Sequence, residues 1–239
     1  MIPKFEICVD SPMSLQNAAQ AGVDRIELCS ALGLGGLTPG AGLVEAARHC
    51  GVPCHAMIRP RGGDFVFDEQ DQAACLVDVA AMKFAGLAGV VIGVAHADGR
   101  LHHNALAKQI EAANGMQVTL HRVFDLTPDP FEALDCAMNL GITRVLTSGQ
   151  AADAGAGTAL IGELVEHAAG RIQIMAGGGV TPGNAPALMA KGVDALHASC
   201  ATTTLSPQPI EHLGIAEQRD TNPDKIAALR AAMTEVLTV

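Results

Sequence analysis

Eight short β-rich runs alternate with alanine-rich helical segments along the chain, and this alternation limits the fold more than any other feature. A glycine ends several of the helical segments just before the next run, as in Gly22-Val23-Asp24, Gly141-Ile142-Thr143 and Gly192-Val193-Asp194. Strands that alternate with helices in this way form a parallel sheet. The expected strands are 4–9, 24–29, 54–59, 89–93, 117–121, 144–147, 173–176 and 195–198.

The segments between these runs carry helix signals. Asp129-Pro130 and Thr181-Pro182 each combine a capping residue with a proline at the start of a helix. Helices are expected at 14–21, 41–50, 69–85, 102–113, 129–140, 156–169, 182–191 and 223–237.

Eight β/α units in 239 residues predict an α/β fold of the (β/α)8 (TIM) barrel type. A doubly wound open sheet is the alternative. No linker or shift in composition interrupts the chain, so we expect one domain over residues 1–239. The polar, proline-containing stretch at about 202–222 is expected to be a loop before the final helix at about 223–237.

Composition excludes several classes of protein. The net charge is −10, aromatic residues make up 3%, and there is no Trp or Tyr, which disfavours a nucleic-acid partner. No apolar run reaches the roughly 18 residues needed to cross a bilayer, and no signal peptide is recognisable, so we expect a cytoplasmic protein without a membrane partner. The seven cysteines are scattered rather than arranged as a disulfide framework.

The expected strands would direct an unusual number of polar side chains into the barrel. Alternate strand residues face inward in a closed barrel. Buried charges persist only when they are paired, so Glu6 and Glu27 should meet Arg25, Arg59, His121 or His197. The inward positions are Glu6, Cys8, Asp10, Arg25, Glu27, Cys29, His55, Met57, Arg59, Thr119, His121, His197 and Ser199.

The stretch "MIRPRGGDF" (57–65) places two arginines and two glycines at the end of the third strand. Guanidinium groups and glycine-exposed amides both favour oxyanions. Barrels often bind phosphate at the loops after strands seven and eight. We therefore expect an anion-binding pocket; the alternative is that both arginines pair with Glu27, Asp64 or Asp125. The pocket residues are Arg59, Arg61, His121, Gly177, Gly178, Gly179 and Ser199.

Several motifs together resemble the CutC family, whose members are described as copper homeostasis proteins. The motifs are "EICVDS" (6–11), "DRIELCSALGLGGLTPGAG" (24–42), "MIRPRGGDF" (57–65), "HRVFD" (121–125), "RVLTSGQ" (144–150) and "GGGVTPGN" (177–184). The resemblance runs from the start of the chain to about Ser199. It implies a (β/α)8 barrel and a cytoplasmic, copper-associated role.

Two thiols suit that role, because copper(I) prefers soft sulfur ligands. Cys8 and Cys29 are expected at the same level on adjacent strands, both pointing inward, with Met57, His121 or His197 as further ligands. The alternative is that both cysteines pack as small apolar residues. If the protein has this role, copper is its cofactor or partner.

A second function remains open from the residues. Glu6, Glu27 and His121 are candidates for acid–base catalysis on a small anionic metabolite, phosphorylated or carboxylated. Nothing in the sequence selects one reaction. An alanine-rich outer ring of helices could also support a homodimer.

Overall fold

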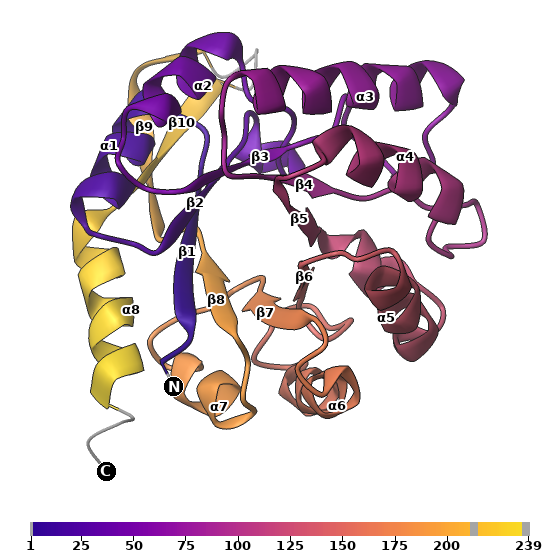
Figure 1. Ribbon diagram of the computed structural model, residues 1–239. Helices are drawn as coiled ribbons and strands as arrows, with labels where there is room; N and C mark the ends of the chain where they lie inside the picture. Colours follow the sequence, from indigo (N-terminus) through magenta and orange to yellow (C-terminus); the bar gives the residue numbers. More distant parts are fainter. Residues whose placement is uncertain (1, 211–214, 236–239) are drawn as a thin grey trace.

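The eight expected strands close into a parallel barrel in a computed structural model, which describes residues 2–210 and 215–235 (Figure 1). The first strand pairs with both the second and the eighth, and this closes the sheet. The prediction of a (β/α)8 TIM barrel is therefore confirmed. The strands are β1 Lys4–Val9, β2 Arg25–Leu28, β3 Cys54–Met57, β4 Gly89–Ile92, β5 Gln117–Leu120, β6 Arg144–Thr147, β7 Gln173–Gly177 and β8 Ala195–Ala198.

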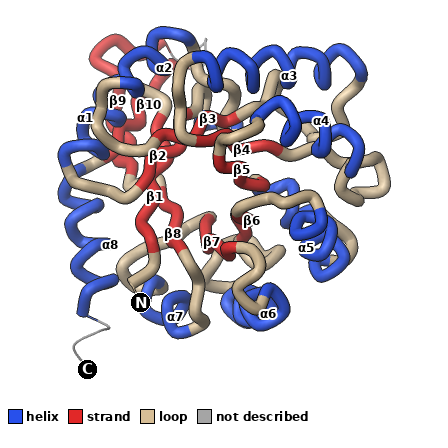
Figure 2. Tube along the Cα trace, in the orientation of Figure 1, coloured by secondary structure: helices blue, strands red, loops and turns tan. Residues whose placement is uncertain are grey.

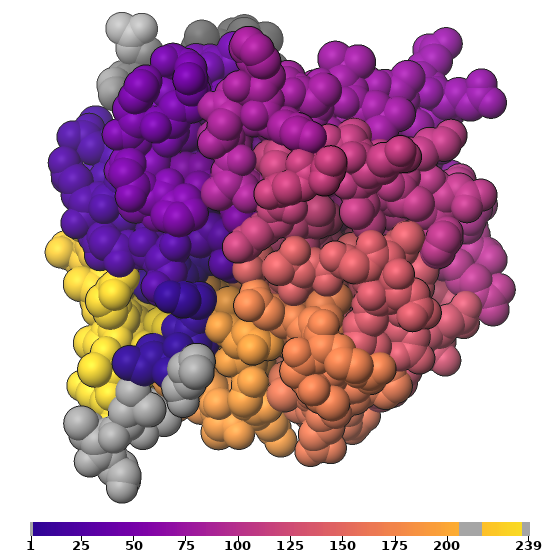
Figure 3. Space-filling model, in the orientation of Figure 1, coloured from indigo at the N-terminus to yellow at the C-terminus, as the bar shows by residue number. Residues whose placement is uncertain are grey.

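Helices surround the barrel on its outer side (Figure 2). Consecutive parts of the chain follow one another around the surface, and the last helix returns beside the N-terminal segment (Figure 3). The α-helices are α1 Pro12–Gln20, α2 Ala41–Arg48, α3 Glu69–Phe84, α4 His103–Ala113, α5 Pro130–Asn139, α6 Thr158–Ala168, α7 Ala185–Ala190 and α8 Pro223–Glu235, and the 3-10 helices are η1 Leu32–Leu34 and η2 Arg122–Leu126.

Local capping chemistry explains where several helices begin. The Asp129 carboxylate accepts hydrogen bonds from the first turn of α5, which Pro130 opens as expected. The expected start at Thr181-Pro182 is wrong, because α7 begins three residues later, at Ala185. There the Asn184 side chain accepts from the Thr181 amide and holds the preceding residues in a turn.

The strand residues divide between two environments, as their alternation predicts. Ile7, Val9, Ile26 and Leu28 belong to the large apolar core that continues into the surrounding helices. The interior of the barrel holds polar side chains such as Glu6, together with small apolar clusters. This polar interior positions the candidate site.

The segment predicted as a loop at 202–222 instead contains an antiparallel hairpin, β9 Ala201–Ile210 and β10 Ile215–Thr221. Its β-branched residues Thr202–Thr204 pair with Gln218–Asp220 on the other strand, which is the strand signal that the polar composition hid. Ser11 donates to the Asp220 carboxylate, fixing the base of the hairpin beside α1. The last two residues of the expected helix at 223–237 lie outside the described residues.

Candidate functional site

Four buried charged side chains form a chain of contacts across the barrel interior. Arg25 Nε donates to Glu6 Oε2, and His197 Nδ1 lies 2.7 Å from Glu6 Oε1. His197 Nε2 lies 3.7 Å from Glu27 Oε2. The expected pairing of Glu6 with Arg25 and His197 is thus confirmed, and the charged neighbour of Glu27 is His197, since Arg25 is committed to Glu6.

These contacts move the pKa values of the two carboxyl groups in opposite directions. Burial alone would raise the pKa of Glu6, but the hydrogen bond from His197 and the charge of Arg25 hold it well below its usual range. Burial and the nearby Glu6 raise the pKa of Glu27. Burial would lower the pKa of His197, yet the charges of Glu27 and Cys8 raise it well above its ordinary value. Two carboxyl groups at different acidities therefore flank one histidine.

The Cys8 thiol forms a cluster with His197 and Glu27, and one ligand atom from each lies within 4.8 Å of the others. Strand register explains the cluster. Cys8 lies opposite Glu27 on β2, while Glu6, two residues earlier on β1, lies opposite His197 on β8. Thiolate, imidazole and carboxylate are the protein groups that bind transition metals.

Cys29 lies next to this cluster rather than in it. The register places Cys8 level with Glu27. Cys8 and Cys29 therefore do not lie at the same level, contrary to the expectation from the sequence. Cys29 Sγ donates to Glu27 Oε2 at 3.5 Å and packs against Met57 and Val91. Burial and the Glu27 charge raise the pKa of the Cys29 thiol well above its usual value. Cys29 is therefore placed to orient Glu27.

A cavity of about 380 Å³ lies at the carboxyl ends of the barrel strands. All three members of the cluster line it, whereas Glu6 does not. Its volume is within the range of small-molecule sites and exceeds what a single ion needs. Of the residues predicted for metal or anion binding, those lining it are Cys8, Met57, Arg59, His121, Gly178, Gly179, His197 and Ser199.

The two arginines of "MIRPRGGDF" have different environments. Arg59 lines the cavity and donates to the carbonyl oxygens of Leu34, Gly36 and Gly63, which leaves its buried Nε without a partner in the described part of the chain. Arg61 Nε instead donates to Asp71 at 2.7 Å, and Arg61 Nη2 to Asp64 at 3.1 Å. Arg61 is not on the cavity, because these carboxylates hold it at the rim loop.

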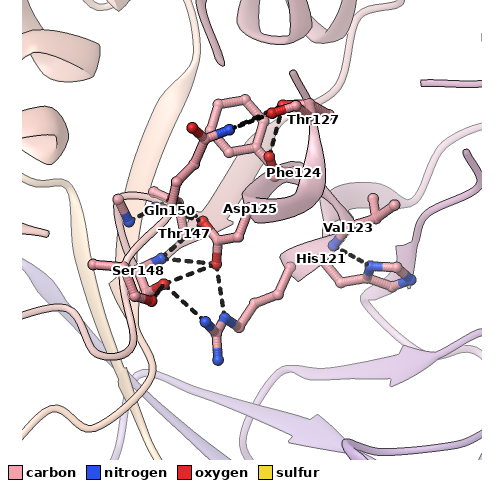
Figure 4. Close-up of polar contacts among 11 residues, drawn as sticks. His121, Val123, Phe124, Asp125, Thr127, Thr147, Ser148 and Gln150 are labelled. Atoms are coloured by element: carbon pink, nitrogen blue, oxygen red, sulfur yellow. Dashed lines mark hydrogen bonds and ion pairs between the residues drawn. The ribbon is translucent and has the colours of Figure 1, made fainter. Parts of the chain in front are cut away.

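His121 presents a neutral ring to the cavity. Its Nδ1 accepts from the Val123 amide at 3.1 Å, so the ring proton is on Nε2 (Figure 4). Burial and the charge of Arg59 lower the pKa of His121 to about 3. The ring contacts Phe65 with centroids 4.6 Å apart, and a side chain at Gly93 would overlap it. Its Nε2 has no partner among the described residues.

Asp125 organises the neighbouring strand end. Its carboxylate accepts from the Thr147 hydroxyl and from both the amide and the hydroxyl of Ser148 (Figure 4). Arg122 Nε donates to Asp125 Oδ2 at 2.8 Å, and Arg122 Nη2 donates to Ser148 Oγ at 2.8 Å. Two of the three guanidinium nitrogens of Arg122 are therefore fixed, and Arg122 lines the cavity.

The three glycines predicted for the anion pocket have two roles. Gly177 is the last residue of β7, where an added Cβ would lie 2.5 Å from Leu146 and 3.0 Å from His197, so it permits close packing rather than lining the cavity. Gly178 and Gly179 follow the strand with φ of 94° and 70° and do line it. Their left-handed conformation requires glycine.

The anion pocket predicted from the sequence does not include two of the cavity arginines. Arg122 follows His121 at the end of β5, and its position in "HRVFD" was the available signal. Arg219 lies on β10, whose last residues hydrogen-bond to the start of α1, and its side chain lines the cavity. Its role could not be found while the segment was interpreted as a loop.

Comparison with known proteins agrees with this architecture. The model of the CutC family matches residues 3–202. A CutC family protein of Sinorhizobium medicae is 46% identical over 233 residues, covering 96% of this chain and 95% of the relative. One of Caulobacter vibrioides is 45% identical over 237 residues, covering 95% and 97%. The chain belongs to the CutC family.

Solved structures extend the comparison. A CutC protein of Streptococcus agalactiae, described as a proposed copper homeostasis protein, superposes with a TM-score of 0.79 at 30% identity, covering 83% of this chain and 99% of that one. Thiamine phosphate pyrophosphorylase of Pyrococcus furiosus has a TM-score of 0.60 at 14% identity, covering 99% and 97%, which shows the fold alone. In this CutC family member, no helix within residues 2–210 and 215–235 has both the length and the apolar character to cross a membrane.

Proposed function

We propose that this CutC family member acts in copper homeostasis by binding copper(I) in the cytoplasm through Cys8 and His197, with Glu27 as a third donor. The observation that carries the proposal is the buried cluster whose three ligand atoms lie within 4.8 Å of one another. The name of the Streptococcus agalactiae relative supports copper as the metal.

The contact between Glu6 and His197 supports a metal-binding role for this histidine. Histidine ligands usually donate the second ring N–H to a carboxylate, which orients the ring and fixes the nitrogen that faces the metal. His197 Nδ1 lies 2.7 Å from Glu6 Oε1, and Arg25 holds the other oxygen of Glu6. His197 Nε2, on the Glu27 side, is then the nitrogen available to a metal once its proton is displaced.

The donors fit copper(I) in part. Thiolate and imidazole are good copper(I) ligands, whereas a carboxylate is a harder donor. Met57 lines the same cavity, and Cys29 adjoins Glu27, so further soft sulfur lies close to the cluster. The thiol must lose its proton to bind, so uptake should release protons.

A competition titration against a chromophoric copper(I) chelator, under reducing conditions, tests the assignment. We expect the wild-type protein to bind one equivalent and Cys8→Ser to bind none. Cys29→Ser should weaken binding by roughly 10–100-fold, as for residues that orient a ligand. Cys136→Ser, on α5, is the matched control and should bind normally.

Unchanged uptake by Cys8→Ser would remove the cluster from the proposal. A parallel titration with zinc(II) is the second arm, because the same three donor types also suit zinc. Binding of zinc but not of copper(I) would overturn the choice of metal.

We also propose, as a second candidate, an enzyme that performs acid–base chemistry on a small anionic metabolite. The favouring observation is the 380 Å³ cavity, with Glu27 on its wall and the pKa values of Glu27 and Glu6 moved in opposite directions. Glu27 is the candidate acid or base, and Glu6 holds His197. Incubation of metal-free protein with small phosphorylated and carboxylated compounds, followed by NMR, should show turnover that Glu27→Gln abolishes. Turnover that survives Glu27→Gln contradicts this role.

A further inference from the structure

The charge of the cavity lining is opposite to that of the chain. The protein has a net charge of −10, yet the cavity is lined by three arginines, Arg59, Arg122 and Arg219, and by one carboxyl group, that of Glu27. A local excess of guanidinium groups in an acidic protein attracts anions to that place and to few others. The lining therefore favours a negatively charged occupant.

The cavity residues also carry polar atoms that the protein itself leaves unpaired. Five buried side-chain nitrogen or oxygen atoms lack a hydrogen-bond partner in the described part of the chain, and three belong to Glu27, Arg59 and His121. Buried polar atoms are normally paired, so such a concentration needs an explanation. Arg59 Nε and His121 Nε2 are donors, whereas Glu27 Oε1 is an acceptor when the group is ionised.

A second group of donors lies where β7 ends. Neither Gly178 nor Gly179 has a partner for its N–H within residues 2–210 and 215–235. A Cβ on Gly178 would lie 3.1 Å from Arg122 Nη1, so this guanidinium nitrogen adjoins the glycine turn. Asp125 and Ser148 fix the rest of Arg122, which leaves Nη1 preorganised for a ligand.

We propose that the cavity binds a small organic molecule bearing an oxyanion, a phosphate ester or a carboxylate, together with a neutral oxygen acceptor such as a carbonyl or hydroxyl. The oxyanion binds Arg122, Arg219 and the amides of Gly178 and Gly179. The second oxygen accepts from the Nε2–H of His121, and a hydroxyl proton of the ligand is donated to Glu27. This inference rests on the enzyme candidate and names its substrate class.

The neutral state of His121 explains its role toward the second oxygen of the ligand. An uncharged imidazole that is fixed as the Nε2–H tautomer donates one hydrogen bond and polarises an oxygen without supplying a proton at neutral pH. The low pKa that burial gives His121 is consistent with that role. The ring is also held in place by Phe65 and by the Val123 amide.

Isothermal titration at low ionic strength with three probes tests the site: inorganic phosphate, glycerol and glycerol 3-phosphate. Only glycerol 3-phosphate combines an oxyanion with a neutral hydroxyl, so we expect it to bind at least ten times more tightly than either single-function probe. Arg219→Ala should weaken the binding of phosphate and glycerol 3-phosphate by at least tenfold. Arg219 is exposed and has no ion pair with described residues, so this variant should fold. Arg100→Ala, at an exposed arginine away from the cavity, should bind normally.

His121→Asn separates the two ends of the ligand. Asparagine can still accept from the Val123 amide but lacks the Nε2–H donor. It should therefore weaken the binding of glycerol 3-phosphate several-fold while leaving the binding of inorganic phosphate unchanged. Equal losses for both probes would overturn the assignment of His121. Absence of binding to wild type, or normal binding by Arg219→Ala and Arg122→Ala alike, would overturn the whole site.

The same titrations distinguish this inference from the two proposed functions. Wild-type protein that binds glycerol 3-phosphate selectively but takes up no copper(I) would contradict the copper proposal and leave the oxyanion site standing. Oxyanion binding without turnover of any compound tested would end the enzyme candidate and leave the binding site standing. Turnover without selective oxyanion binding would contradict this inference and leave the enzyme candidate standing.

Discussion

The barrel interior contains two sets of buried polar groups that differ in how completely they are paired. The paired set consists of Glu6, Arg25, Thr119 and Arg144. All three guanidinium nitrogens of Arg144 donate to side chains, namely Gln173, Thr119 and Gln117. The open set consists of Glu27, Arg59 and His121, each with one unpartnered atom in the described part of the chain.

The position of the two sets explains the difference. Arg144 and its glutamine partners are the first residues of β5, β6 and β7, at the end of the barrel remote from the cavity. Arg59 and His121 lie just after the ends of β3 and β5, on the cavity. Buried polar atoms without hydrogen-bond partners lower stability, so we expect them where a ligand supplies the missing partners. The paired set therefore stabilises the barrel, whereas the open set belongs to the proposed binding site. His55 is the exception, because its buried Nδ1 has no partner among the described residues although it lies near Glu6 and Arg25.

Breaking the paired set at Glu6 should have the largest effect. Glu6→Gln leaves Arg25 without its buried counter-charge and leaves His197 with Glu27 alone, and we expect a loss of about 3–5 kcal/mol in the free energy of unfolding. Glu27→Gln is the matched control in the open set. It should cost at least about 2 kcal/mol less, because no arginine depends on Glu27. Urea denaturation measures both, and equal losses would contradict the division into two sets.

Acid should destabilise the protein through His121. Its folded pKa of about 3 lies below the ordinary value of 6.5, because burial and then Arg59 disfavour the charged ring. The unfolded chain binds a proton at this histidine near pH 6.5, whereas the folded chain does not. The contribution of His121 to the free energy of unfolding is therefore fully present above about pH 6.5 and is lost progressively on acidification to about pH 3. The slope is about 1.4 kcal/mol per pH unit for one histidine.

The variant His121→Asn isolates this contribution, because it removes the titrating ring and retains an acceptor for the Val123 amide. Between pH 6 and pH 4, its unfolding free energy should fall less steeply than that of the wild type, by up to the slope of one proton. Identical slopes would show that His121 takes up its proton in the folded state.

A smaller effect is expected from Thr119→Val, which conserves shape and removes one acceptor. Arg144 Nη1 donates to Thr119 Oγ1 at 3.0 Å. Loss of a partner for a buried charged donor should cost about 1–3 kcal/mol. Ligand binding at the cavity should not change, since Thr119 and Arg144 lie outside it. A thermal melt and a glycerol 3-phosphate titration on the same sample test both parts.

Much of the fold could be predicted because the barrel strands and helices carry local signals. The glycine that ends a helix before a strand has positive φ at Gly22, Gly86, Gly141 and Gly192, as the helix-terminating role requires. The hairpin could not be predicted because polar composition hid the local β-branched signal of Thr202–Thr204, and the pairing that forms it, Thr203 with Arg219 and Thr204 with Gln218, is long-range.

The site could be predicted by strand face but not by partner. Period-two alternation correctly directed Glu6, Glu27 and His197 inward. It could not fix the register, which sets Cys8 beside Glu27 instead of Cys29. Nor could the alternation distinguish Arg59 from Arg61. Arg61 donates to Asp71 on α3, and the direction of the Asp71 side chain depends on how α3 packs.

The hairpin β9–β10 supplies a cavity residue without being part of the barrel sheet. The match to the family model ends at residue 202, so the cluster of Cys8, Glu27 and His197 falls inside the matched range and Arg219 outside it. The two hairpin strands pair with each other and add nothing to the hydrogen-bond ladder of the barrel. A substitution in this hairpin can therefore change the cavity wall at Arg219 without removing a hydrogen bond of the barrel ladder.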